Sequence, residues 1–450
     1  MPFTAAARAS LLPNLPSSRM RPYVAVLALL AACSLEHAPA PNELAFGTAT
    51  AISAATGVGA TPTFAVSPSG ATTVAWVSAP EGGSDGRLYS RADSAATPAE
   101  LRDSLGPIEP HGEAPPKLTY GPDGRLYALY SVARLVPGRR FPATALRLAV
   151  SRDDGRTWGA PLTVGANAAD GTPFASRNFH ALHLGADGAL YVSWLQSSNG
   201  RSATFVTRST DAGQSWSAPV HVGGEACPCC RTALATARDG TLYVAWREVF
   251  PGNVREVVVA RSADHGATWS APVPVQTDRW VYDGCPHAGP SLAVDSTGAL
   301  HVAFWTGKEG AAGVFYARST DGGRTFTAPA SLGSARFSQP AHAQLAVAPG
   351  GRLVAAWDDG TLRTPRVVVR VSADGGRSFG APQAVSDSGR AATFPVLAAA
   401  PRGVTVAWSD QTAADGEHAA HAHPMARDTT PMPLATVGST RVIVRRAALR

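Results

Sequence analysis

The chain has 450 residues and a formal net charge of +6, and only 16% of its residues are charged. Arginines near the two ends of the chain account for the positive excess: Arg8, Arg19, Arg21, Arg441, Arg445, Arg446 and Arg450. The body between them is close to neutral and has no basic run interleaved with aromatic residues, so the composition does not indicate a nucleic-acid partner.

The N-terminal segment, residues 1–32, is predicted to be a signal peptide that is not part of the fold. It contains an apolar run at residues 24–30, which is too short to cross a bilayer as a stable helix. The run ends in Leu-Ala-Ala-Cys, which resembles the lipobox of bacterial lipoproteins, with Cys33 as the lipidated residue. An ordinary signal peptide that happens to contain a cysteine is the alternative. Met20 is the more natural start of the protein.

Residues 33–43 are predicted to form a short tether to a single domain at residues 44–450. Several acyl chains on Cys33 would anchor the protein stably to a membrane. We therefore expect a location in the bacterial cell envelope, at the outer membrane or facing the periplasm, with the lipid anchor as the membrane contact.

After the tether, seven repeat units follow, each with an apolar strand, a turn and a strand that ends in an aromatic residue. The aromatic residues are Trp76, Tyr130, Trp194, Trp246, Phe304, Trp357 and Trp408. Sequence repeats that recur about every 50 to 60 residues predict a propeller or an array. Residues 46–53 resemble residues 379–386, so we expect the N-terminal strand to complete the last unit and close a ring.

Five copies of the pattern Ser-x-Asp-x-Gly-x-Ser/Thr-Trp/Phe separate these units, at residues 151–158, 209–216, 262–269, 319–326 and 372–379. The Ser and Asp side chains of such a pattern can bond the backbone of a tight turn, and the glycine takes a positive φ. The predicted structural aspartates are Asp153, Asp211, Asp264, Asp321 and Asp374.

This pattern resembles the Asp-box (BNR) repeat of the sialidase superfamily. The resemblance implies an all-β propeller, for which we expect seven blades, with six blades as the alternative. It also implies that the boxes are structural turns on the face opposite the site.

The sialidases of this superfamily use three arginines to clamp the sugar carboxylate, a Tyr–Glu pair as nucleophile and an Asp as acid/base. The first arginine lies in an Arg-Ile-Pro motif at the first inner strand, but residues 59–64 contain no arginine here. The remaining candidates for catalytic roles are Arg177, Arg231, Arg247, Glu248, Tyr282 and Asp283. We expect Arg247 and Glu248 on a loop, where a surface ion pair is the better interpretation.

Alignment of the units on their aromatic strand ends places Cys227 over Cys285 and Cys229 over His287. The same register predicts four more polar residues at the mouth of the central channel: His111, Glu113, His180 and His342.

Three interpretations stay open for Cys227, Cys229, Cys230, Cys285 and His287. An even number of cysteines in an oxidising compartment is typical of disulfides. Thiolate and imidazole groups are ligands for zinc or copper, to which a later loop could add His418, His421, His423 and Met425. The adjacent Cys229 and Cys230 also permit redox chemistry.

These observations favour an envelope-anchored, sialidase-like propeller that lacks the full catalytic set and binds a metal or another ligand at a Cys/His-lined axial site. An exo-sialidase or related glycoside hydrolase acting on acidic glycans is the first alternative. A scaffold in an envelope protein complex is the second, because propellers serve many uses.

Overall fold

The computed structural model describes residues 42–54, 56–80, 85–137, 142–198, 200–334, 340–361, 364–412 and 440–448. These residues belong to one compact unit, Pro39–Arg450. The predicted signal peptide, Cys33 and the loop with His418, His421, His423 and Met425 lie outside the described residues. Within the described ranges, no helix is long and apolar enough to cross a membrane.

The described strands form antiparallel groups of consecutive strands. The first groups and the two short N-terminal strands are β1 (Ala45–Phe46), β2 (Thr50–Ala51), β3 (Val58–Val66), β4 (Thr72–Ala79), β5 (Arg87–Ala92), β6 (Ala99–Leu101), β7 (Lys117–Tyr120), β8 (Leu126–Arg134), β9 (Ala143–Ser151), β10 (Leu162–Thr163), β11 (Arg177–Leu184), β12 (Leu190–Ser198), β13 (Arg201–Ser209) and β14 (Val220–Ala226).

The later groups continue in the same manner. They are β15 (Ala233–Thr236), β16 (Leu242–Phe250), β17 (Val254–Ser262), β18 (Val273–Pro274), β19 (Ser291–Val294), β20 (Leu300–Thr306), β21 (Gly313–Ser319), β22 (Ala330–Ser334), β23 (Gln344–Val347), β24 (Leu353–Asp359), β25 (Arg366–Ser372), β26 (Gln383–Ala384), β27 (Arg390–Ala400), β28 (Gly403–Thr412) and β29 (Thr440–Ala448).

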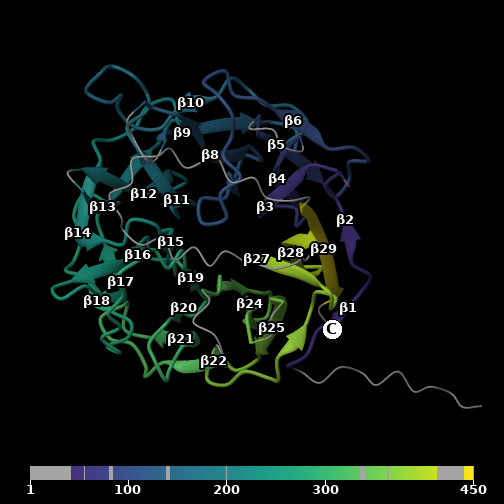
Figure 1. The fold of residues 1–450 in the computed structure, drawn as a ribbon, viewed down its shortest axis with the longest axis vertical. Coiled ribbons are helices and arrows are strands. Elements are labelled where there is room, and N and C mark those ends of the chain that lie inside the picture. Colours follow the sequence, from purple (N-terminus) through teal and green to yellow (C-terminus); the bar gives the residue numbers. More distant parts are fainter. Residues whose placement is uncertain are drawn as a thin grey trace, which may run out of the picture. The chain divides into compact units, whose positions relative to one another are not determined.

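Where Figure 1 labels the first strand of a group, that strand lies towards the centre of the unit Pro39–Arg450. The first strands of the groups are β3, β7, β11, β15, β19, β23 and β27. Each contacts the next one in this order, and β27 contacts β3. The all-β fold is the one predicted. Although this cyclic order is what seven blades require, the blade number itself stays a prediction.

The N-terminal strands pair with the C-terminal strand. Ala45 of β1 lies opposite Ala448, and Thr50 of β2 lies opposite Val444, both in antiparallel register with β29. The predicted joining of the two chain ends in one sheet is therefore confirmed. It covers an edge of β29 that would otherwise expose unpaired backbone groups.

Apolar side chains pack between neighbouring groups. Leu129 of β8 and Val192 of β12, for example, lie in one cluster and are fully buried. Side chains of this kind contribute about 1.5–3 kcal/mol each when buried. Four of the tryptophans at the predicted strand ends are also almost completely buried: Trp76, Trp194, Trp246 and Trp408. This packing holds the inner strands at the positions from which the site is built.

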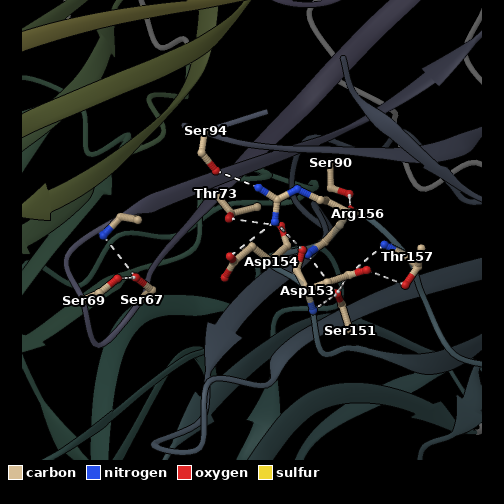
Figure 2. A network of polar contacts seen from close by, with 12 residues as sticks. Ser67, Ser69, Thr73, Ser90, Ser94, Ser151, Asp153, Asp154, Arg156 and Thr157 are labelled. Carbon is tan, nitrogen blue, oxygen red and sulfur yellow. Dashed lines mark hydrogen bonds and ion pairs between the residues drawn. The ribbon is translucent and has the colours of Figure 1, made fainter. Parts of the chain in front are cut away.

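Each of the five predicted aspartates bonds within its own turn, as Figure 2 shows for residues 151–158. Ser151 Oγ donates to Asp153 Oδ1 at 2.7 Å, and the Thr157 amide donates to the same oxygen at 2.8 Å. The Gly155 amide donates to Ser151 Oγ at 2.8 Å, with a φ of 83° at Gly155. Glycine adopts such a φ without a steric penalty.

Candidate functional site

Glu113 lies in the segment before β7 and has no exposed surface. Its Oε2 accepts hydrogen bonds from the amides of Arg231 (3.1 Å) and Gly289 (2.9 Å), and its Oε1 accepts one from the Arg231 guanidinium. Arg231 also donates from Nη2 to the Ala343 carbonyl at 3.0 Å. This buried ion pair therefore joins segments that precede four different inner strands, β7, β15, β19 and β23.

His342, in the segment before β23, is paired with Asp358 of β24. His342 Nδ1 and Asp358 Oδ2 are 2.5 Å apart, and the Phe394 amide donates to the same oxygen at 3.1 Å. Burial opposes ionisation of Asp358, but the charge and hydrogen bonds of His342 hold the pKa of this carboxyl below its usual value. The Phe394 ring lies 3.9 Å from the His342 ring, which fixes the imidazole from its other side.

The pocket between these groups is small. Its lining includes Thr61, Gly112, Arg231, His342 and Phe394, and the volume open to the centre of a water molecule is about 10 Å³. Such a volume accommodates about one water molecule. This pocket therefore has no room for a sugar ring.

The three candidate arginines of a carboxylate clamp are Arg177, Arg231 and Arg247, and each donates hydrogen bonds within the chain. Arg177 donates to the carbonyls of Val164 (2.7 Å) and Ala166 (2.5 Å). Arg247 donates to the carbonyls of Ala288 (3.0 Å) and Trp305 (2.6 Å). Arg231 is already paired with Glu113. Each of the three guanidinium groups therefore has partners within the chain, and the roles considered for them in a carboxylate clamp stay predictions.

The prediction that Arg247 and Glu248 form a surface ion pair on a loop was wrong. Both residues lie within β16, not on a loop, and both side chains are buried. Successive side chains of a strand point to opposite faces, which separates them. Glu248 accepts a hydrogen bond from the Gly224 amide at 3.2 Å, on the side away from the partners of Arg247.

Tyr282 and Asp283 are not placed as a nucleophile and its partner. The Tyr282 ring stacks on Trp280 with centroids 4.9 Å apart. Asp283 is exposed and accepts a hydrogen bond from the Asn253 side chain. The two side chains have different partners, and the catalytic roles considered for them stay predictions.

Four cysteines and one histidine form a cluster, which we call the thiol cluster: Cys227, Cys229, Cys230, Cys285 and His287. The first three lie in the turn after β14, and the other two lie before β19. Cys227 Sγ is 3.8 Å from Cys229 Sγ and 3.5 Å from Cys230 Sγ. The ligand atoms of Cys229, Cys285 and His287 also lie within 4.8 Å of one another. The two segments that aligned in the sequence thus meet in space.

All four described cysteines are free thiols. The Sγ–Sγ distances of 3.5 and 3.8 Å within the first turn are far longer than the roughly 2.05 Å of a disulfide bond. Cys229 Sγ and Cys285 Sγ, a pair of the kind considered for a disulfide, also lie within 4.8 Å of each other. The disulfide, metal and redox interpretations of the cluster therefore all stay predictions.

Two arginines favour ionised sulfur in the thiol cluster. Arg255 Nη1 donates to Cys227 Sγ at 3.0 Å. Burial raises the pKa of Cys227, but hydrogen bonds from Cys229 and Cys230 and the charges of Arg255 and Arg247 bring that pKa well below its usual value. The hydrogen bond from Cys229, followed by that from His287, lowers the pKa of Cys285 to about 5. Burial, followed by hydrogen bonding to Cys227, raises the pKa of Cys229 and of Cys230, so these two cysteines are thiols in the absence of a metal. Thiolate is the form of cysteine that binds metals, so metal binding would displace their protons.

Of the other two histidines predicted at the channel mouth, His111 lies beside the thiol cluster and His180 does not. The His111 ring is 5.6 Å from the His287 ring and 5.5 Å from the Phe179 ring. His180 is fully buried, and burial lowers its pKa to about 3, so that it is neutral. His111 extends the polar lining beside the cluster, whereas His180 belongs to the interior.

Sequence reasoning missed Arg255 and Asp358. Arg255 lies in an apolar strand, β17, and Asp358 lies at the end of β24, in neither case within a motif. The one available signal was a charged residue inside a run of valine or alanine. That signal does not say which residue the charge faces.

Comparison with known proteins identifies the repeat. The family model of the BNR repeat-like domain matches residues 106–279 and again residues 240–408. Among curated proteins, none matches the chain in sequence.

Several solved structures share the fold. A protein of unknown function from Dyadobacter fermentans is 16% identical with a TM-score of 0.51, over 91% of this chain and 100% of that chain. An ulvan lyase of polysaccharide lyase family 25 is 13% identical with a TM-score of 0.55, over 80% of this chain and 93% of that chain. An α-L-arabinofuranosidase from Fusarium graminearum is 15% identical with a TM-score of 0.51, over 75% and 96% of the two chains. Identities this low show the fold and not the activity.

The two matched segments together extend over residues 106–408, which is more than half of the chain. They include all five Asp boxes and every segment that contributes to the thiol cluster. The chain belongs to the BNR repeat-like domain family, and its fold is that of the sialidase-superfamily β-propellers.

Proposed function

We propose that this sialidase-like propeller binds a thiophilic metal ion, zinc or copper, at the thiol cluster. The observation that carries the proposal is the convergence of four thiols and one imidazole from two separate segments. Thiolate and imidazole are the ligands that zinc and copper(I) prefer.

The sulfur spacing supports the proposal. In a zinc–thiolate site with bonds of about 2.3 Å, tetrahedral geometry places the sulfur atoms about 3.8 Å apart. Cys227 Sγ and Cys229 Sγ are 3.8 Å apart, and Cys227 Sγ and Cys230 Sγ are 3.5 Å apart. Little movement of these side chains is needed for them to bind one ion.

The direct test is elemental analysis of protein exported in its native host and purified without a chelator. We expect zinc or copper in the wild type and its loss in the variant Cys229→Ser, because Cys229 belongs to both ligand groups. His265→Ala is the matched control, since His265 is an exposed histidine in an Asp box. A folded wild-type protein that contains no metal and binds none on addition would contradict the proposal.

A glycan is the second candidate ligand. Its support is a groove of about 320 Å³ over β12, β13 and β14, lined by polar and aromatic groups that include Arg201, Phe205, His221 and Glu225. Pockets of this size accommodate small ligands. The exo-sialidase alternative has less support, since its candidate arginines bind backbone carbonyls. Release of the fluorophore from a sialoside or another acidic glycoside would establish it, and no release from any would remove it.

We also propose that Cys33 carries a lipid that anchors the protein in the bacterial envelope. The lipobox-like sequence before Cys33 supports this proposal. In a fractionated bacterial host, the wild type should be found with membranes and Cys33→Ala should not. Co-purification of a protein partner from detergent extracts would favour the scaffold alternative.

A further inference from the structure

We infer that the thiol cluster holds two monovalent copper ions that share the Cys229 thiolate as a bridging ligand. The inference rests on the proposed metal-binding function and specifies the ion, its number and its ligands. Its starting point is that the candidate ligands fall into two groups of three, Cys227–Cys229–Cys230 and Cys229–Cys285–His287.

The number of ligands per group favours copper(I) over zinc. Structural zinc is almost always bound by four ligands. Among the described residues, the cluster provides three mutually close ligand atoms in each group and no group of four. A soft monovalent ion accepts three thiolate or imidazole ligands, and thiolates select copper(I). Each group therefore matches one such ion, and the shared Cys229 places the two ions next to each other.

The charges around the thiol cluster are compatible with two bound copper(I) ions. Metal binding displaces the protons of the cysteines that are still thiols. Four thiolates and two monovalent ions then leave two negative charges, and two arginines are in place to compensate them. Arg255 donates to Cys227 Sγ at 3.0 Å. Arg247 is 1% exposed, acts electrostatically on Cys227 and Cys230, and has Nε and Nη1 without a hydrogen-bond partner among the described residues. A buried, incompletely bonded guanidinium is costly unless negative charge lies nearby.

Charge alone does not distinguish two copper(I) ions from one zinc ion, because both leave two negative charges. Two zinc ions would leave none, and the two arginines would then be buried without compensation. The ligand grouping, together with the charge, thus points to two monovalent ions.

Burial differs between the two groups. Cys227, Cys229 and Cys230 are 1–3% exposed, whereas Cys285 and His287 are partly exposed. The second group is therefore the side from which an ion can enter, and the first group shields its ion from water and oxidants.

The test is anaerobic titration of the fully reduced protein with copper(I) acetonitrile complex in competition with a chromophoric copper(I) chelator. We expect saturation at about two equivalents per chain, a short copper–copper distance in X-ray absorption spectra, and ultraviolet-excited luminescence typical of shielded copper(I)–thiolate clusters. Zinc added alone should bind at no more than one equivalent.

Substitutions of single ligands test the two ion sites separately. His287→Ala and Cys227→Ser should each reduce the stoichiometry to about one equivalent, because each removes a ligand that belongs to one group only. Cys229→Ser should abolish the copper–copper signal. His265→Ala should bind two equivalents, as the wild type does. Thermal unfolding of each apo variant establishes that it is folded, and the partly exposed position of His287 makes His287→Ala the safest variant in this respect.

The outcomes distinguish this inference from the proposed function. Saturation at one copper ion, or a single tightly bound zinc ion that excludes copper, would contradict the two-ion inference and leave the proposed function intact. Failure of both metals to bind would contradict both.

Discussion

At the scale of single residues, the centre of this propeller depends on a few buried charged groups whose partners are distant in the sequence. Glu113 and Arg231 are 118 residues apart, and each is buried against the other. The carboxylate accepts three hydrogen bonds, so its burial is compensated in full. A pair of this kind holds a defined arrangement because neither partner tolerates the loss of the other.

Replacement of Glu113 by alanine tests this role. We expect Glu113→Ala to lower the free energy of unfolding by about 3–5 kcal/mol, because it leaves the buried Arg231 charge without compensation. The measurement is equilibrium unfolding in urea. In Glu100→Ala, which removes a partly exposed ion pair with Arg87 and Arg102, the loss should stay within about 1 kcal/mol. Equal effects of the two substitutions would show that burial of the Glu113 pair has no special role.

At the scale of elements, the Asp-box turn repeats one set of hydrogen bonds. In the third box, Asp264 Oδ1 accepts hydrogen bonds from Ser262 Oγ (2.7 Å) and the Thr268 amide (2.9 Å). The side-chain hydrogen bond from Thr268 is the main reason why the pKa of Asp264 is lowered to about 2. The ionised aspartate therefore belongs to the folded turn.

This lowered pKa gives a pH prediction. An unfolded aspartate has a pKa of about 3.9. The stabilising contribution of Asp264 is therefore complete above pH 4 and is lost as the pH falls towards 2. We expect Asp264→Asn to be less stable than the wild type at pH 7, with the difference shrinking at pH 3, as measured by urea midpoints.

Thr268→Val is the graded control for this prediction, because it removes the hydroxyl donor and keeps the amide donor. Its pH dependence should lie between those of the wild type and Asp264→Asn. Parallel stability curves for all three proteins between pH 7 and pH 3 would contradict the assigned role of the turn.

A second element-scale feature is the close approach of the segments before β15 and β19. A Cβ atom on Gly289 would lie 2.3 Å from the Arg231 carbonyl oxygen. We expect Gly289→Ala to cost about 1–3 kcal/mol of stability, since overpacking forces the backbone apart. Gly159→Ala is the comparison, because its Cβ would meet nothing nearer than 3.4 Å. The measurement is the melting temperature of each variant by calorimetry. An unchanged melting temperature for Gly289→Ala would contradict the close approach of the two segments.

At the scale of the whole unit, the two ends of the described chain share one sheet. Strands β1 and β2 cover the edge of β29, and Leu44 and Ile52 beside them are buried. An uncovered edge strand is a template for pairing with another chain. We therefore expect closure to protect the protein against self-association as well as to stabilise it.

Removal of residues 42–54 tests closure. We expect a loss of about 3–6 kcal/mol, which is the contribution of two buried aliphatic side chains at about 1.5–3 kcal/mol each. The shortened protein should also self-associate through the edge of β29. A chain that begins at Asn42 is the control, and both proteins can be compared by calorimetry and size-exclusion chromatography. A monomer of unchanged stability would contradict this role of β1 and β2.

The sequence by itself determined the repeat, the all-β class, the turns of the five Asp boxes and the meeting of the Cys227 and Cys285 segments. These features depend on local patterns: alternation along a strand, turn chemistry over eight residues, and register between equivalent units. A repeated fold places equivalent positions of neighbouring units side by side, which is why the alignment of Cys229 with His287 predicted a contact.

Only the tertiary structure decided which side chains face each other across the centre. Arg247 was expected on a loop but lies in β16, and Arg255 approaches Cys227 without any motif. Arg231 was a candidate for substrate binding, yet its guanidinium is held by Glu113. The physical reason is that such pairings depend on the direction and spacing of strands that are far apart in the chain, and the backbone pattern of any one unit contains no information about them.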